Sequence, residues 1–154
     1  MKDKYNEFLR IAKHFQNHGI KLLLFGSLGL SQRLNAQYDI DDIDFLIPEI
    51  YINENWQITK QLTEELGYKL EDLHEHQFRY NHYKTAFAAI ESLTPFADIS
   101  IHDIETIEDN GVSYFLLNLQ QYLKVYTASS KDSYRRNKNN AKDLEKIELI
   151  KRQS

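Results

Sequence analysis

Apolar residues recur with a helical period at the start of the chain. Between residues 3 and 18 they are spaced three and four apart, at Tyr5, Phe8, Leu9, Ala12 and Phe15. This spacing puts them on one face of a helix and predicts that the helix packs on the core. Gly19 suits the left-handed residue that often ends a helix. The short apolar segment at residues 20–25 then predicts a largely buried strand.

The next stretch predicts a tight turn and a helix, followed by a strand that carries acids. Gly26 and Ser27 form the turn, and residues 28–34 contain good helix formers behind a serine that can cap them. After a polar loop, residues 42–47 alternate acid with hydrophobe until Pro48 stops the strand. The pattern therefore indicates a strand, a turn and a helix leading into an acidic strand.

The rest of the chain predicts three more strands and three more helices. A helix is expected from about Asn55 to Leu66, with Gly67 as its stop. The other expected elements, in chain order, are strands over 77–83, 85–90 and 96–101, a turn at Asn110-Gly111, and helices around 119–126 and 144–151. We expect the strands to be neighbours in one sheet.

These elements predict the α+β class, with a mixed β-sheet packed by helices and with further helices near the C-terminus. At 154 residues the chain has the size of one domain and can bury one core without disulfides. We expect a single domain over 1–154, with its core at about 20–103 and a C-terminal helical part at about 115–152.

Composition narrows the classes of function. The chain has no cysteine, which excludes thiol catalysis and zinc-thiolate sites and is compatible with a reducing compartment. Neither a signal peptide nor a membrane anchor is recognisable, so we expect a cytoplasmic protein that does not bind membranes. The formal net charge of -4 argues against extensive nucleic-acid binding, and nucleic acid is not an expected partner.

Two acids of the acidic strand can share a cation. Strand side chains alternate between faces, so Asp42 and Asp44 point to the same side, roughly 7 Å apart. Two ionised carboxylates so close repel each other, and a cation between them relieves that repulsion. Mg²⁺ suits such a site because it favours a few carboxylates, several waters and phosphate oxygens. Asp39 and Asp41 form a competing pair, but only the first choice lets the strand's hydrophobes alternate into the core.

The Gly26-Ser27 turn is a candidate phosphate site. At the start of a helix the backbone N–H groups lack intrahelical partners and the helix dipole is positive. Glycine permits close approach of a phosphate to the backbone, and the Ser27 hydroxyl can donate a further hydrogen bond. A third acid, Asp98, lies in the strand expected over 96–101, and pairing of that strand beside the acidic one would bring it to the same face.

Three segments together resemble the signature of the DNA polymerase beta-like nucleotidyltransferase superfamily. They are Phe25-Gly26-Ser27, Asp42-Ile43-Asp44-Phe45 and Ala97-Asp98-Ile99. Residues 38–48 (YDIDDIDFLIP) and Lys142-Asp143-Leu144 look most like the small aminoglycoside-type nucleotidyltransferases and their uncharacterised relatives. The resemblance implies the nucleotidyltransferase fold.

The resemblance also implies an activity and a role for each matching residue. The activity is transfer of a nucleoside monophosphate from a nucleoside triphosphate to a hydroxyl of a small-molecule or protein acceptor, with Mg²⁺ or Mn²⁺ as cofactor. Asp42 and Asp44 match the metal-binding acids, and Asp98 matches the third acid, as a metal ligand or a catalytic base. Gly26 and Ser27 match the triphosphate turn. Lys142 is our choice for a further phosphate contact.

Other interpretations stay open. A non-catalytic partner in a toxin-antitoxin type complex would keep the same fold, and an enzyme that adds nucleotides to RNA ends is a weaker alternative. A homodimer is compatible with the sequence. The basic cluster of Lys131, Arg135, Arg136, Lys138 and Lys142 suits a solvated helix face as well as a phosphate site. Arg79 and Lys84 could meet a triphosphate, but their spacing does not single them out.

Overall fold

The chain alternates short strands with helices over its whole length. The computed structural model describes residues 2–34, 38–131 and 133–153, with the backbone alone at residue 2 and at residues 133–141. In order, the helices and strands are α1 (Lys2–Gln16), β1 (Leu23–Phe25), α2 (Gly26–Ser31), β2 (Ile43–Ile47), α3 (Trp56–Glu65), β3 (Lys69–Asp72), β4 (Gln77–Tyr80), β5 (Tyr83–Ala89), α4 (Leu93–Ala97), β6 (Glu105–Asp109), β7 (Val112–Leu116), α5 (Leu119–Lys131) and α6 (Ser133–Gln153). Three short 3₁₀ turns lie at Glu49–Tyr51, Ile90–Ser92 and Ile101–Asp103.

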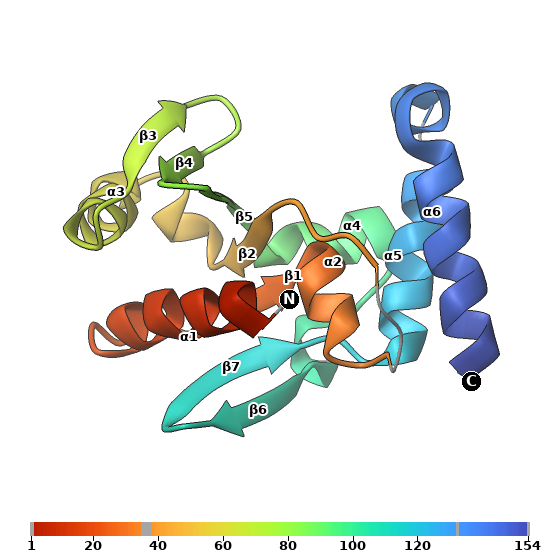
Figure 1. Cartoon of the computed structure of the whole chain (residues 1–154), viewed down its shortest axis with the longest axis horizontal. Helices are drawn as coiled ribbons and strands as arrows, with labels where there is room; N and C mark the ends of the chain where they lie inside the picture. Colours follow the sequence, from red (N-terminus) through yellow and green to blue (C-terminus); the bar gives the residue numbers. More distant parts are fainter. Residues whose placement is uncertain (1, 35–37, 132, 154) are drawn as a thin grey trace.

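The strands of the described chain form one mixed sheet in the order β3-β4-β5-β2-β1-β7-β6. The acidic strand β2 lies in its middle, antiparallel to β1 and parallel to β5. A second parallel pair joins β1 to β7, whereas the hairpins at the two edges are antiparallel. Figure 1 shows the helix pair α5 and α6 at the opposite end of the molecule from β3 and β4. The predicted α+β class with a mixed sheet is confirmed.

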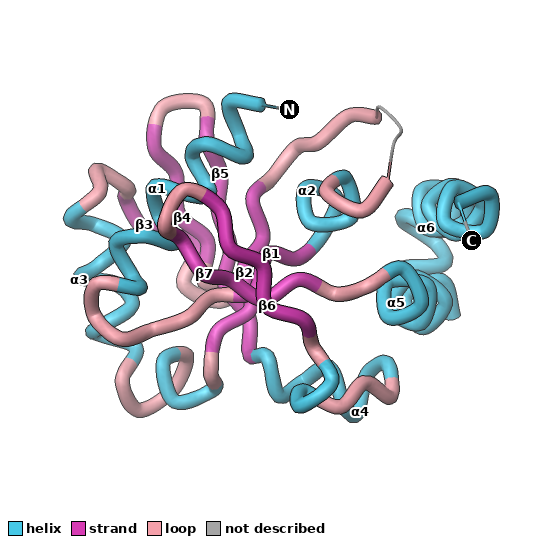
Figure 2. Tube along the Cα trace, turned by 90° about the horizontal axis from the view of Figure 1, so that it is seen from below, coloured by secondary structure: helices cyan, strands magenta, loops and turns pink. Residues whose placement is uncertain are grey.

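Helices cover both sides of the sheet. Figure 2 shows α1 and α3 on one side of the strands and α2, α5 and α6 on the other. The apolar face of α1 packs on the sheet as its spacing predicts. The ring centres of Phe8 and Phe45 are 5.5 Å apart, and those of Phe15 and Phe87 are 5.6 Å apart. In the part of the chain that the structure describes, no helix combines the length and the apolar character needed to cross a bilayer.

One predicted strand is wrong, and three strands, β3, β6 and β7, were not predicted. Residues 93–97 form the short helix α4, and Asp98 follows it in the left-handed conformation, with a φ of 55°. Leu93 and Ala97 are four residues apart and both buried, which is the period of a helix, and Pro95 is tolerated because it lies in the first turn. Strands β3 and β6 are edge strands with few buried residues, so their sequences lack a clear hydrophobic alternation.

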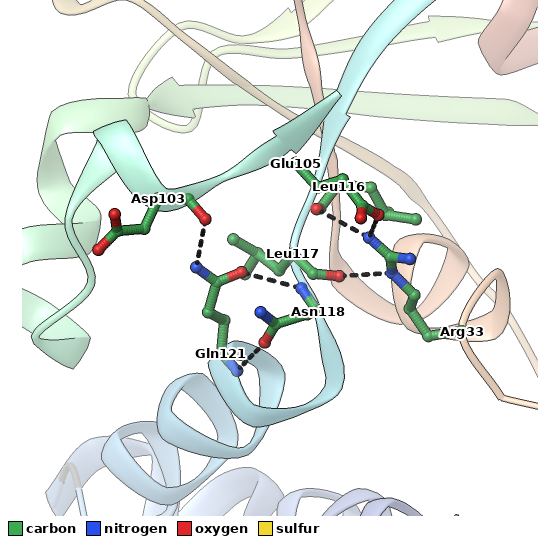
Figure 3. A network of polar contacts seen from close by, with 7 residues as sticks. All are labelled: Arg33, Asp103, Glu105, Leu116, Leu117, Asn118 and Gln121. Atoms are coloured by element: carbon green, nitrogen blue, oxygen red, sulfur yellow. Dashed lines mark hydrogen bonds and ion pairs between the residues drawn. The ribbon is translucent and has the colours of Figure 1, made fainter. Parts of the chain in front are cut away.

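A polar network joins the end of β7 to the start of α5 (Figure 3). Asn118 and Gln121 cap α5 reciprocally, because each side-chain oxygen accepts a hydrogen bond from the other's backbone N–H, at 2.8 and 2.9 Å. Arg33, just after α2, donates to the carbonyl oxygens of Leu116 and Leu117 and pairs with Glu105. These contacts place α2 and α5 at one end of the strands.

Close packing of α2 on β1 depends on Gly29. A side chain at this position would overlap the Tyr122 hydroxyl and come within 2.5 Å of the Leu24 carbonyl oxygen, which accepts a hydrogen bond from that hydroxyl. We expect Gly29→Ala to lower the free energy of unfolding by about 2 kcal/mol, because the backbone must shift to relieve the overlap. Tyr122→Phe is the control and should cost about 1 kcal/mol, the usual worth of one hydrogen bond. Urea denaturation followed by circular dichroism measures both; equal losses would contradict the packing argument.

Candidate active site

Asp44 lies beside the glycine turn at the end of β1. In the sheet register it is opposite Phe25 on β1 and Ala86 on β5. Gly26 follows Phe25 with a φ of +62°, and a Cβ added there would overlap the Asp44 carboxylate. The turn and the acidic strand therefore meet, as the sequence predicts, and only a glycine lets the backbone approach the carboxylate so closely.

Asp42 stands one residue before β2, and strand alternation puts it on the same side as Asp44. The side chains between and after them are buried: Ile43 and Ile47 have no exposed surface and Phe45 has 1%. This burial matches the alternation that favoured Asp42 and Asp44 over the competing pair Asp39 and Asp41. Burial raises the pKa of Asp42, Lys84 acts against that rise, and the charge of Asp41 adds to it.

Asp42 should reduce the stability of the ligand-free chain at neutral pH. Its pKa is raised above the ordinary value of 3.8, so the folded chain binds the proton more tightly than the unfolded chain does. The stabilisation that this bound proton provides is fully present below pH 3.8. It is lost as the pH rises through the pKa of Asp42 in the folded chain. We expect Asp42→Asn to raise the free energy of unfolding at pH 7 by less than about 1 kcal/mol. Thermal unfolding of both proteins between pH 3 and 7 measures the difference, which should shrink toward pH 3; a destabilised variant at pH 7 would contradict this.

Ser27 and Lys142 line one cavity, here called cavity A, of about 360 Å³. Its walls come from distant parts of the chain: the start of α2, the loop before β2, α5 and α6. Lys146 also lines it, is only 8% exposed, and has its ammonium nitrogen 4.4 Å from the centre of the Tyr38 ring. The Tyr38 hydroxyl donates a 2.7 Å hydrogen bond to the Ser27 carbonyl oxygen. The structure thus brings together two of the three predicted phosphate-binding residues, Ser27 and Lys142, and adds a second lysine.

Cavity A also contains acids. Asp39 and Asp41 line it from the loop, and Asp143 and Glu145 line it from α6. The carboxylate of Asp143 accepts a 2.9 Å hydrogen bond from the Ser129 hydroxyl, which ties α6 to α5. A free anion would meet these carboxylates as well as the lysines, so the site suits a phosphate group that arrives with a cation better than it suits a bare anion.

A second cavity, cavity B, of about 480 Å³, lies on the Asp44 side of the sheet. Its floor includes Asp44, Ala86 and Ala88, and Phe25 and Phe96 border it. The small alanine side chains leave the surface of the sheet open beside the carboxylate. Cavity B is therefore mostly apolar, with Asp44 at one side and with His74, Glu75 and His76 also in its lining.

Asp98 does not complete a three-carboxylate site with Asp42 and Asp44. It is exposed at the end of α4 and lines another cavity, against α5, where its carbonyl oxygen accepts a 3.0 Å hydrogen bond from Lys124. Among the described residues, no group of three or more histidine, aspartate or glutamate side chains is arranged to hold a metal ion. Asp98 was expected beside Asp42 and Asp44 because a strand was predicted over 96–101, and that strand does not form. No catalytic role is therefore assigned to Asp98.

The two remaining acids fit a magnesium ion that arrives with a nucleotide. Mg²⁺ is commonly bound by one or two carboxylates together with waters and substrate phosphate oxygens. Strand alternation puts the Asp42 and Asp44 carboxylates on one side of the sheet, and Asp44 lies against Gly26 of the turn. Oxygen ligands of this kind suit Mg²⁺ or Mn²⁺ and do not suit a zinc site, which favours histidine and cysteine.

Two further basic residues near the site were not singled out by the sequence. Continuing the register of β2 and β5 by one residue before Ile43 and Thr85 puts Lys84 beside Asp42, and Lys146 is buried in the wall of cavity A. The four-residue spacing of Lys142 and Lys146 is a weak signal for a shared helix face. In the basic cluster, the side chains of Arg135, Arg136 and Lys138 lie outside the described residues.

Comparisons with known proteins show which proteins this chain is similar to. No family model matches it. It is 45% identical over 147 residues to the uncharacterised protein YnaI of Bacillus subtilis, covering 95% of this chain and 94% of that protein. Among solved structures it is similar to ANT(2'')-Ia in complex with adenylyl-2''-tobramycin, with 13% identity and a TM-score of 0.62 over 96% of this chain and 87% of that one. The solution structure of ANT(2'')-Ia gives 14% identity and a TM-score of 0.63, covering 97% and 83%.

A Thermotoga maritima protein classed provisionally as a nucleotidyltransferase is also similar, with 15% identity, a TM-score of 0.51, and coverage of 90% of this chain and 95% of that one. At such low identities these likenesses establish the fold. The relationship to YnaI is close enough over nearly the whole length to establish kinship. The chain therefore belongs to the family of Bacillus subtilis YnaI and has the nucleotidyltransferase fold.

Proposed function

We propose that this chain is a metal-dependent nucleotidyltransferase that moves a nucleoside monophosphate from a nucleoside triphosphate to an acceptor hydroxyl. The observation that carries the proposal is the contact between Asp44 and Gly26, because the next residue, Ser27, lines a cavity with two lysines. A carboxylate against a turn that also borders a lysine-bearing cavity suits a triphosphate that carries its own cation.

Each residue has a role that follows from its place. Lys142 and Lys146 would contact phosphate oxygens from α6, and the Ser27 hydroxyl would contact them from the turn. Asp42 and Asp44 would hold the cation, which, when bound, neutralises phosphate charge and orients the triphosphate. The backbone at Gly26 leaves room for Asp44 to face that position. These groups would position the triphosphate and neutralise its charge. Positioning and charge stabilisation are most of what a protein contributes to phosphoryl-type transfer.

Cavity B would bind the acceptor. It adjoins Asp44, so a hydroxyl held there would lie near the reacting phosphate. Its apolar borders, Phe25 and Phe96, suit the carbon skeleton of a small molecule or a side chain of a protein. ANT(2'')-Ia, which has this fold, was solved with an adenylylated small molecule, adenylyl-2''-tobramycin, and this supports transfer to an acceptor hydroxyl as the general reaction.

Incubation with labelled nucleoside triphosphates tests the proposal. The full chain would be mixed with each of ATP, GTP, CTP and UTP, a panel of hydroxyl-bearing small molecules and a cell extract, with Mg²⁺ or with a chelator. We expect binding of at least one triphosphate that requires Mg²⁺, and label transfer with release of pyrophosphate. If no triphosphate binds in the presence of Mg²⁺ or Mn²⁺, the proposal is wrong.

One observation favours a second function, that of a non-catalytic partner in a toxin-antitoxin type complex. The residues of β5 that share the Asp44 side of the sheet are Lys84, Ala86 and Ala88, and none of them is an acid. A nucleotidyltransferase fold with only two carboxylates could bind nucleotide without transferring it. Mg²⁺-dependent binding without label transfer, together with a stable complex with a protein encoded beside this one, would favour the second function.

A further inference from the structure

Lys84 lies alongside Asp42 in the middle of the sheet. Strands β2 and β5 are parallel, with Ile43 beside Thr85 and Asp44 beside Ala86. One residue earlier, this register aligns Asp42 with Lys84. Neighbouring strands are about 4.8 Å apart, and aligned residues project to the same side, so the ammonium group shares the side of the sheet that carries the acid pair.

The rest of this side of β5 offers no ligand atoms. Ala86 and Ala88 follow Lys84 at alternate positions, and both border cavity B with Asp44. A third metal-binding side chain from β5 would have to come from one of these three positions. The position nearest Asp42 holds a cation instead.

Among the charged neighbours of Asp42, Lys84 stabilises the ionised carboxylate most. Burial raises the pKa of Asp42, and among the surrounding charges Lys84 opposes this rise most strongly, ahead of Arg79 and Lys4. Lys84 thus acts on Asp42 through its charge. It is half-buried, which limits its screening by water.

We propose that Lys84 competes with a free divalent cation for Asp42, so that this chain takes up its metal with the triphosphate and not before it. A divalent cation at Asp42 and Asp44 is repelled by the nearby ammonium group. A bound triphosphate removes that repulsion, because its oxygens can neutralise Lys84 and ligate the cation together. Lys84 is thus a positioning and specificity residue of the same site, and this inference rests on the proposed function.

Binding of Mn²⁺ to the full chain without nucleotide tests the inference. Electron paramagnetic resonance of free Mn²⁺ measures it independently of turnover. Removing a unit charge close to a divalent ion, at the effective dielectric of a partly buried site, should tighten Mn²⁺ binding roughly 5- to 20-fold in Lys84→Met. Lys84→Arg, which keeps the charge, should stay near the wild type.

The control is Lys13→Met, which makes the same charge change at an exposed position of α1. It should leave Mn²⁺ binding unchanged. In an Asp42→Asn background the gain from Lys84→Met should disappear, since the competition is for that carboxylate. Lys84→Gln repeats the test if the methionine variant folds poorly.

A second measurement distinguishes this inference from the proposed function. With a chelator present, Lys84→Met should bind ATP several-fold more weakly than the wild type, because one contact to the phosphates is lost. If removing the Lys84 charge leaves Mn²⁺ binding the same or weaker, or if neither protein binds Mn²⁺, the inference is wrong whatever the turnover. If Mn²⁺ binding tightens but no nucleotide binds, the competition is real and the nucleotidyltransferase proposal fails.

Discussion

Asp44→Asn is expected to lower the rate of nucleotidyl transfer about 1,000-fold, or about 4 kcal/mol in the barrier. The amide has the same shape as the carboxylate and can keep the packing against Gly26, but it lacks the charge that would hold the cation. Affinity for the metal–triphosphate complex should fall as well. Initial rates at saturating Mg²⁺, with affinity measured by calorimetry, separate the two effects.

The matched control for this substitution is Asp39→Asn. Asp39 is exposed in the loop before β2 and belongs to the competing acid pair. It makes the same change of charge on the wall of cavity A, so it should reduce the rate less than about threefold. Equal losses in the two variants would contradict a specific role for Asp44, because an exposed loop acid would then matter as much.

Gly26→Ala is expected to weaken binding of the metal–triphosphate complex about 100-fold, a loss of about 2.7 kcal/mol. The new methyl group would overlap the Asp44 carboxylate and push it from its place. The left-handed φ of +62° adds a backbone cost of about 1 kcal/mol for any residue with a Cβ. Calorimetric titration with a non-hydrolysable triphosphate and Mg²⁺ measures the loss.

Gly19→Ala separates these two costs. Gly19 also has a positive φ, of +78°, but no atom lies within 4 Å of an added Cβ. This variant should lose about 1 kcal/mol of stability and keep its nucleotide affinity. If Gly26→Ala binds the triphosphate as well as Gly19→Ala does, the contact between the turn and Asp44 has no part in binding.

The elements with a strong hydrophobic period were predictable from sequence. The observed ends of helix α1 and strand β2 lie within two residues of the predicted ends. One face of each element is buried, so its apolar residues must recur with the helical or strand period, and that period is visible in the sequence. The meeting of Gly26 with Asp44 was also expected. It needs only that two strands close in sequence pair in the sheet.

Residues 93–99 show why the third acid was misplaced. Leu93, Ala97 and Ile99 are buried, and either a strand or a short helix could bury some of them. A run of seven residues is too short for the spacing of its apolar residues to distinguish the two. Packing against α5 decides it, and a single sequence does not reveal that partner. Lys84 was passed over for a related reason, since its alignment with Asp42 depends on the register of a parallel pair whose strands are about 40 residues apart.

Cavity A draws its walls from Ser27 on one helix and from Lys142 and Lys146 on another, more than a hundred residues later. During synthesis, the early strands and the acid pair would emerge from the ribosome well before the lysines do. Contacts so distant in sequence also form late in refolding, because closing long loops is entropically costly. On the proposed function, a growing chain would gain its lysine contacts to the nucleotide only when its last helix has docked, so that stabilisation by bound ligand comes at the final step of maturation.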